Sequence, residues 1–546
     1  MDKKLMNFLG NFFSVIHRLI EFVGRWIFLL AAYLTGPPEM PPPIENKNIT
    51  MRSLNELSIM IRQKKISSED AVKAYIDRIK KIQPIVNCMT EDRFEEALKE
   101  ARQCDAILNS PDAPSTAILE KEKPFFGVPF TTKDCIAIKG MKQTAGLVSR
   151  REIRSDRDAE AIKLIREAGA IPLATTNVSE LAMWWESSNC LYGTTRNPYN
   201  TWHIVGGSSG GEGCLQAAAG ACFGIGSDIG GSIRIPCFFN GIFGHKPSRG
   251  IVSNDGQYPS CNTEDQSRLL STGPMCRFAT DLKPILKVLA DKNVAKLNLD
   301  AKVDISKLKF YYMEDDGGQF FITPVSPDIK QAMNKVISYL TWGHKIKVEK
   351  VKIKKFKKSL ALWFANMASP KDKDFAYELA NRKGRINVWW EFIKWITFTS
   401  HHTLIGLVTS TFEIFGIQYD SEIRTKLVQE SRDLYQEFRD MLGEDGVFLY
   451  PTHPTPAPLH HEPLIKPLNF SYTAIINCLG LPATACPLGF SNGLPIGIQV
   501  VAGLYQDHLT LAVAEELERN FGGWQAPELN NQIKSNDNQL IDSKNQ

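Results

Sequence analysis

The sequence lacks the features of several protein classes. Its eleven cysteines include no Cys-x-x-Cys pair and no closely spaced cluster, so neither a disulfide framework nor a zinc site is expected. Neither sign of charge dominates, because 64 basic residues face 60 acidic ones and leave a net charge of +4. That charge does not indicate a nucleic-acid partner. There is no Walker A motif, and no Gly-x-Gly-x-x-Gly follows a strand pattern, so nothing indicates a nucleotide site.

The composition is that of a folded globular protein. Over 546 residues, 43% are hydrophobic and 23% are charged, which excludes general disorder and a polytopic membrane protein. Apolar strand patterns alternate with helical ones, which is typical of an α/β domain. The expected strands are Phe125–Thr132, Ile171–Thr175, Phe223–Gly226, Val447–Tyr450, Ala483–Pro487 and Ile496–Ala502; the expected helices include Ala71–Ile82 and Asp158–Ala168.

The N-terminus carries the longest apolar run, over residues 8–34, which is long enough to cross a membrane. Polar residues interrupt this run with helical spacing and form one stripe: Asn7, Asn11, Ser14, Arg18, Glu21 and Arg25. We therefore expect a membrane helix that either spans the bilayer or lies in its interface. The alternative is a soluble amphipathic helix docked on the domain.

The composition divides the whole chain into four regions. We expect a membrane-anchoring helix over residues 1–36, a stiff Pro-rich linker over 37–50, one large α/β domain over 51–527 and a disordered polar tail over 528–546. Lys3 and Lys4 precede the helix, and no basic residue follows it until Lys47. If the helix spans, this asymmetry favours a cytosolic N-terminus and a lumenal body.

Two clusters of glycine and serine are the main candidates for chemistry, Gly206–Gly213 and Gly230–Ser232. Several backbone N–H groups around a serine are what an oxyanion hole needs, although a phosphate-binding or purely structural loop would have the same composition. The first cluster also matches the Gly-x-Ser-x-Gly nucleophile elbow of the α/β-hydrolases. That pattern requires a catalytic histidine, and no later histidine has a context that marks it as one.

Lys133 is a second candidate, because it follows an apolar strand that could bury it. An ordinary lysine pKa of about 10.4 leaves roughly one amine in 2,500 neutral at pH 7, so a lysine base requires burial. A solvated Lys133 beside Asp134 is the alternative.

These motifs, taken in order, resemble those of the amidase signature family. The matching segments are Gly127–Asp134, Gly206–Gly213, Gly226–Pro236, Gly241–Pro247, Ser271–Pro274, Gly480–Ala483 and Gly493–Gln499. The resemblance covers residues 53–527, and within the family the chain looks most like the fatty-acid amide hydrolases. It implies a single large domain in which helices surround a mixed β-sheet.

The resemblance also implies a Ser-Ser-Lys triad. Ser232 would be the nucleophile that forms an acyl-enzyme, Ser208 would bridge after a cis peptide at Gly207, and Lys133 would be the base. The N–H groups of Ile229, Gly230, Gly231 and Ser232 would bind the oxyanion. The resemblance calls for no metal and no cofactor.

The segment Val388–Gly416 bears on the substrate. It is rich in tryptophan and phenylalanine, and Trp395–Phe412 contains no charged residue apart from histidine. It is expected to be either a buried helix pair or a cap that dips into a membrane, and fatty-acid amide hydrolases have a helical cap in this region. With the N-terminal helix, this predicts a lipid amide substrate.

The expected partners and location follow from these features. We expect a membrane partner, no nucleic acid, and a location on an endomembrane or a lipid droplet, and a homodimer is an open alternative. The competing interpretations are an amidase of the same family for smaller amides, a glutaminase subunit of a transamidosome, a His-dependent esterase using Ser208 or Ser209, and a non-enzymatic membrane scaffold.

Overall fold

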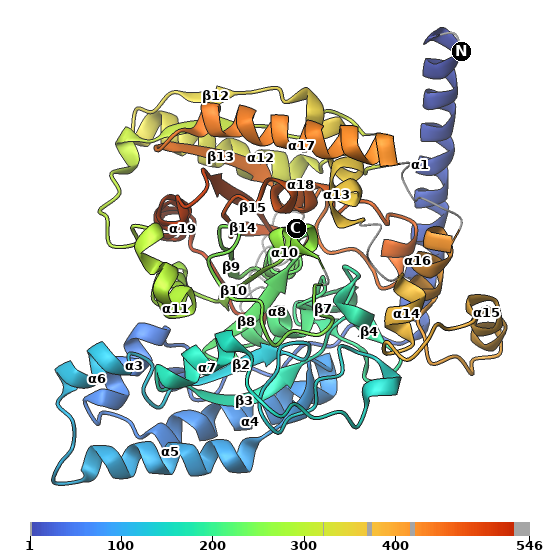
Figure 1. The fold of residues 1–546 in the computed structure, drawn as a ribbon. Helices are drawn as coiled ribbons and strands as arrows, with labels where there is room; N and C mark the ends of the chain where they lie inside the picture. The colour runs from blue at the N-terminus through green and yellow to red at the C-terminus, as the bar shows by residue number, and fades with distance from the viewer. Residues whose placement is uncertain (1–2, 262, 320, 369–373, 415–420, 529–546) are drawn as a thin grey trace, which may run out of the picture.

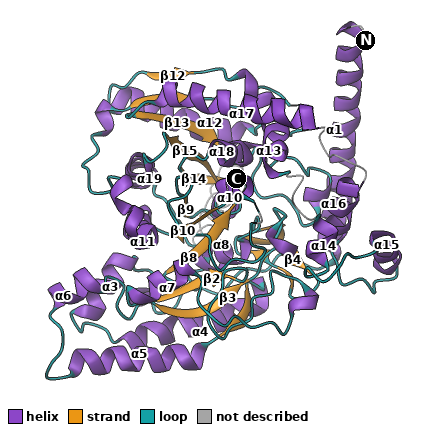
Figure 2. Ribbon diagram, viewed as in Figure 1, coloured by secondary structure: helices purple, strands orange, loops and turns teal. Residues whose placement is uncertain are grey.

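The computed structural model describes residues 3–261, 263–319, 321–368, 374–414 and 421–528. Nearly all of the tail expected over 528–546 lies outside these residues. The architecture is a mixed sheet surrounded by helices (Figures 1 and 2), which confirms the predicted α/β class and the mixed sheet.

The main sheet has 11 strands in the order β1-β3-β2-β8-β10-β9-β14-β15-β13-β11-β12. Strand β2 pairs in parallel with β3 and with β8, whereas β8 and β10 pair antiparallel. The strands are β1 (Met89–Asp92), β2 (Pro129–Lys133), β3 (Ile171–Thr176), β8 (Phe223–Asp228), β9 (Phe243–Lys246), β10 (Ser271–Cys276), β11 (Lys309–Tyr312), β12 (Val348–Lys350), β13 (Gly446–Pro451), β14 (Ala483–Ser491) and β15 (Leu494–Ala502). Two short ribbons pair β4 (Ser188–Asn189) with β5 (Gly193–Thr194) and β6 (Arg196–Asn197) with β7 (Asn200–Ile204).

Two helices near the start of the body begin at serine caps that the sequence supplies. Ser53 and Glu56 form a capping box at the start of α3 (Leu54–Arg62), and the Ser67 side chain caps α4 (Ser68–Val86). The other helices of the body are α2 (Lys47–Thr50), α5 (Phe94–Asn109), α6 (Thr116–Glu122), α7 (Glu160–Glu167), α8 (Gly210–Ala217), α9 (Arg234–Asn240), α10 (Glu264–Leu269), α11 (Ala279–Ala290), α12 (Pro327–Ser338), α13 (Ser359–Met367), α17 (Ser421–Leu442), α18 (Ser471–Leu479) and α19 (Asp507–Phe521).

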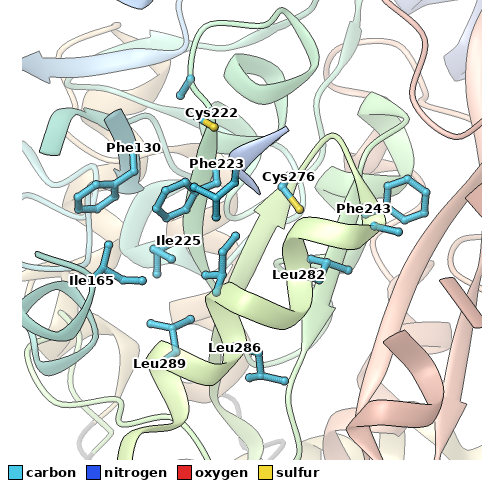
Figure 3. Packing of buried hydrophobic residues seen from close by; sticks show 14 of the residues in the cluster. Phe130, Ile165, Cys222, Phe223, Ile225, Phe243, Cys276, Leu282, Leu286 and Leu289 are labelled. Atoms are coloured by element: carbon cyan, nitrogen blue, oxygen red, sulfur yellow. The ribbon is translucent and has the colours of Figure 1, made fainter. Parts of the chain in front are cut away.

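A packed apolar core supports the strands that carry the candidate site. The rings of Phe130 on β2 and Phe223 on β8 stack with their centroids 5.5 Å apart. Leu282 and Leu286 of α11 belong to the same cluster (Figure 3). Full burial of each such side chain contributes about 1.5–3 kcal/mol to the stability of the fold. This core therefore holds β2 and β8 in fixed positions.

Helix α1 (Lys3–Leu34) projects beyond the body with the N-terminus at its far end (Figure 1). Of the residues described, none belongs to a helix both long and apolar enough to cross a membrane, so the spanning alternative finds no support. The physical reason is the set of charged side chains at Arg18, Glu21 and Arg25, which interrupt the apolar run.

The second half of α1 and the linker lie against the body. The Thr323 hydroxyl donates to Glu21 over 2.8 Å, and the Trp202 indole donates to the Gly36 carbonyl over 2.9 Å. In the linker, the Glu39 N–H donates to Thr201 over 2.8 Å. The Pro-rich stretch expected as a spacer therefore runs along the surface of the domain.

The segment expected as a cap forms two helices, α15 (Val388–Ile396) and α16 (Leu404–Ile414), which pack on each other and, through α16, on α14 (Phe375–Leu379). In α16 Leu407 is fully buried, as a buried pair would require, whereas Phe412 of the same helix is 58% exposed. Helix α15 and the turn after it expose large apolar side chains, with Phe398 96% exposed. Residues 415 and 416 lie outside the described part.

Candidate active site

Lys133 is the last residue of β2, and its side chain is buried. Its Nζ lies 2.7 Å from the Ser208 Oγ and 3.1 Å from the Ser227 Oγ. Burial lowers the pKa of Lys133 below its ordinary value, because an ammonium ion is poorly solvated in the interior. The solvated alternative for Lys133 is therefore wrong, and its amine is suited to accept a proton.

Ser208 lies in the loop before α8, where the peptide after Gly207 is cis, as the family resemblance implied. The backbone of this loop is held by Ser187, whose hydroxyl lies 3.0 Å from the Gly206 carbonyl and accepts the Gly210 N–H over 3.0 Å. A side chain at Gly207 would collide with the Trp184 carbonyl. Only glycine fits there, and the close approach fixes Ser208 against Lys133.

Ser232 lies in the turn between β8 and α9 and is partly exposed, as are Ile229 and Gly230, whereas Lys133 and Ser208 are buried. The Ser209 N–H donates to the Ser232 carbonyl over 3.2 Å, which links the two serine loops. The Ser208 hydroxyl forms a hydrogen bond with the Lys133 amine. Among the described side chains, no hydrogen bond joins Ser208 to Ser232. The structure thus brings Lys133 and Ser208 into contact and sets Ser232 at the accessible edge.

The carbonyl groups of the predicted oxyanion loop are fixed by distant side chains. The Trp363 indole donates to the Ile229 carbonyl over 2.8 Å, and the Thr473 hydroxyl donates to the Gly230 carbonyl over 2.7 Å. In a planar trans peptide the N–H points opposite to the carbonyl, so the Gly230 N–H points away from Trp363. These contacts orient the loop.

One predicted oxyanion donor is already engaged. The Gly231 N–H donates to the Asp228 carboxylate over 2.7 Å, and the Arg234 guanidinium also bonds to Asp228 at 3.0 Å. Although burial alone would raise it, Arg234 and the hydrogen bonds hold the pKa of Asp228 below its ordinary value. The Gly231 N–H thus stabilises the loop in this structure. Ile229, Gly230, Gly231 and Ser232 all stay predicted oxyanion donors.

Sequence reasoning missed a second set of supporting residues. Glu212 of α8 is fully buried and accepts hydrogen bonds from Thr131 of β2 and from Thr176 at the end of β3, the latter over 2.8 Å. Burial raises the pKa of Glu212 to about 7. Its only sequence signal was a lone acidic residue inside the glycine-rich cluster. It ties together the elements that carry Lys133 and Ser208.

Two buried histidines of the body, His245 and His453, bond to residues outside the serine loops. His245 is buried, with Nδ1 2.9 Å from the Thr484 hydroxyl and Nε2 3.1 Å from Asp507. His453 is also buried, its Nδ1 lies 2.8 Å from the Thr455 carbonyl, and burial lowers its pKa to about 3. The basic side chain against Ser208 is Lys133, which disfavours the His-dependent esterase.

Comparisons with known proteins show the family of this chain. The profile of the Amidase family matches residues 70–511. Human fatty-acid amide hydrolase 2 is 47% identical over 93% of this chain and 96% of its own length. Zebrafish (Danio rerio) fatty-acid amide hydrolase 2-A is 45% identical over 93% of this chain and 98% of its own length.

Solved structures share the fold. A fatty acid amide hydrolase superposes with a TM-score of 0.70 and 22% identity over 88% of this chain and 87% of that one. A bacterial aryl acylamidase superposes with a TM-score of 0.71 and 22% identity over 86% of this chain and 96% of that one. With the match over residues 70–511, these findings establish that the chain belongs to the amidase signature family of enzymes, which hydrolyse amides.

Proposed function

We propose that this protein is a membrane-associated fatty-acid amide hydrolase that works through Ser232, Ser208 and Lys133. The observation that carries the proposal is the 2.7 Å contact between the buried Lys133 amine and the Ser208 hydroxyl, next to the accessible Ser232 loop. A buried amine on a serine has the chemistry of a proton relay.

The proposed reaction has two halves. The Ser232 oxygen attacks the amide carbon while its proton passes to Ser208, and the Ser208 proton passes to Lys133. The N–H groups of Ile229, Gly230, Gly231 and Ser232 stabilise the oxyanion. The C–N bond then breaks as Lys133, through Ser208, returns the proton to the departing nitrogen. Water, which gives its proton to Lys133 by the same route, attacks the acyl-Ser232 ester. The ester C–O bond breaks, Ser232 takes the proton back through Ser208, and the fatty acid is released.

The environment of Lys133 favours transfer of a proton from Ser208 to its amine. The relay needs Lys133 as a neutral amine at the start and as an ammonium after the attack. Burial lowers its pKa and so raises the neutral fraction at neutral pH. The Asp228 charge opposes that shift, which keeps the ammonium form accessible when the proton arrives.

Two observations support a long-chain lipid substrate. The similar proteins at 45% and 47% identity are fatty-acid amide hydrolases by name. Helix α1 and helix α15 expose apolar side chains, including Trp26 at 60% and Trp390 at 56%. Such surfaces are costly in water and suit the boundary between lipid headgroups and acyl chains.

These features support an interfacial role for α1. Its exposed apolar residues include Leu19, Phe22, Val23, Trp26, Ile27 and Leu30. An amphipathic helix that lies in the membrane plane buries one face in lipid and keeps the other on protein. The protein is proposed to act on an endomembrane or a lipid droplet, and the homodimer remains a prediction.

The test is turnover of amides that share one amine and differ in acyl length, using the detergent-solubilised full chain. We expect kcat/KM to rise with acyl length and Ser232→Ala to abolish turnover of every substrate. Hydrolysis of short acyl amides alone would instead identify an amidase for small substrates. Absence of any Ser232-dependent turnover would contradict the proposal.

A further inference from the structure

The segment from Asn177 to Ser187, called here the bridging segment, connects β3 to the first of the small ribbons. Both of its ends contact the loop that carries Ser208 or the start of α8 after it. The Gly211 N–H donates to the Asn177 carbonyl over 3.0 Å, and the Ser187 hydroxyl lies 3.2 Å from the Ser208 carbonyl. Between these contacts, its Trp184 carbonyl lies against Gly207. Any displacement of the bridging segment would therefore move the backbone around Ser208.

The same segment holds the start of helix α16. Glu180 is 4% exposed. Its Oε1 lies 2.8 Å from the Nδ1 of His402, and its Oε2 accepts the Thr403 N–H over 2.9 Å and the Thr403 hydroxyl over 2.7 Å. A buried carboxylate needs donors of this kind, and a negative charge at a helix N-terminus is favourable. One side chain thus fixes the first turn of α16.

The residues around Glu180 let its carboxylate lie close to the start of α16. A Cβ at Gly406 would lie 2.8 Å from the Glu180 Oε2, so a glycine lets the carboxylate approach the helix. Leu181 and Ala182 have positive φ angles of 54° and 55°, a backbone conformation that such residues rarely adopt. Leu181 is buried with Leu147 and with Leu379 of α14. Polar and apolar contacts therefore attach the bridging segment to the helices of the cap.

The other acidic residue of the bridging segment points elsewhere. The Oε1 of Glu186 lies 2.9 Å from the Nδ1 of His460, in the loop that leads to the turn Glu462–Leu464, on which α1 packs. It is 4% exposed, like Glu180, and also pairs with a histidine. Glu186 is thus a matched control, whose described side-chain hydrogen bonds go to His460 and His461 and not to α15 or α16.

We propose that Glu180 is a positioning residue that sets α15 and α16 relative to the catalytic serine loop, and so determines how strongly the enzyme prefers long acyl chains. This inference rests on the proposed function. The apolar side chains of α15 are the surface offered to lipid. Glu180 makes polar contacts with His402 and Thr403 at the start of α16, on which α15 packs. A long acyl chain that reaches these helices gains from their placement, whereas a short chain does not.

The experiment compares Glu180→Ala with Glu186→Ala in the detergent-solubilised full chain, using a hexanoyl and an oleoyl amide of one amine. We expect Glu180→Ala to lower kcat/KM for the oleoyl amide about tenfold, the scale of one lost charge-assisted hydrogen bond. The hexanoyl amide should change by less than about twofold. Glu186→Ala should leave the ratio of the two substrates unchanged.

Two further variants separate positioning from folding. Glu180→Gln should restore the wild-type ratio, because its amide can accept from Thr403 and donate to the His402 ring. His402→Leu, which alters the cap side of the contact, should lower the same ratio even if Glu180→Ala fails to fold. Limited proteolysis provides a readout without substrate: cleavage within residues 388–403 should accelerate in Glu180→Ala and in His402→Leu, and not in Glu186→Ala.

Equal losses on both amides together with unchanged proteolysis would overturn the inference about Glu180. A wild-type enzyme that does not hydrolyse the oleoyl amide would overturn the proposed function instead, and the proteolysis result would then decide the positioning role alone.

Discussion

Replacing Lys133 tests the relay through the leaving group. Lys133→Met keeps most of the buried volume but removes the amine that contacts Ser208 at 2.7 Å. An amide needs its nitrogen protonated before it departs, while the alkoxide of an ester departs more readily. General acid–base help is typically worth about 10² to 10⁴ in rate, or about 3 to 5 kcal/mol of activation free energy.

We therefore expect kcat/KM for a long-chain amide to fall by about 10² to 10⁴ in Lys133→Met, and the matched ester to fall at least about tenfold less. The pH profile should also change. Because burial lowers the pKa of Lys133, wild-type activity should rise with pH as the amine loses its proton, and this limb should vanish in the variant.

The assay is kcat/KM for the amide and the ester across the neutral and alkaline range, with the thermal unfolding midpoint as a control for folding. Equal losses on both substrates, with an unchanged pH profile in a folded variant, would show that Lys133 is structural and that the base lies elsewhere.

Four other variants test separate features of the protein. His245→Ala and His453→Ala should each cost far less than the ~10⁴-fold loss typical of a triad member, since Lys133 contacts Ser208; a loss of that size with an intact circular dichroism spectrum would refute the triad. Deletion of residues 1–36 should weaken vesicle binding but leave residual binding through α15, and a truncated protein with no lipid binding would contradict a membrane role for the cap. Glu212 has a pKa raised from 4.5 to about 7, so its stabilising effect is complete below about pH 4.5 and is lost as the pH rises toward 7. Glu212→Gln should remove this pH dependence, worth up to about 3 kcal/mol in urea unfolding, and an unchanged dependence would exclude Glu212 as its source.

Local signals predicted much of the fold. The apolar run Ile171–Thr175 is strand β3 with one residue added, and Ser67 caps α4 as its sequence context indicated. Buried strands read as continuous apolar runs, and caps are local chemistry, so both are visible in one sequence. The start of β2 was predicted too early, because Phe125–Val128 forms a turn before the strand.

The supports of the site were not predictable in this way, because they are long-range contacts. Trp363 and Thr473 reach the oxyanion loop from 134 and 243 residues away, and the Glu180–His402 contact joins residues 222 apart. The position of helix α1 also depends on a long-range contact that the sequence does not reveal. Its polar stripe was visible, but only the fold shows that Glu21 meets Thr323 on the body.

The proposed mechanism depends on an acyl-enzyme on Ser232, which intact-protein and peptide mass spectrometry can detect. The full-length enzyme is mixed with a long-chain acyl amide, quenched with acid during turnover and digested. We expect the mass of one fatty acyl group on the peptide that contains Ser232, and its loss in Ser232→Ala. An acyl group on Ser208 or Ser209, or turnover that persists in Ser232→Ala, would contradict it.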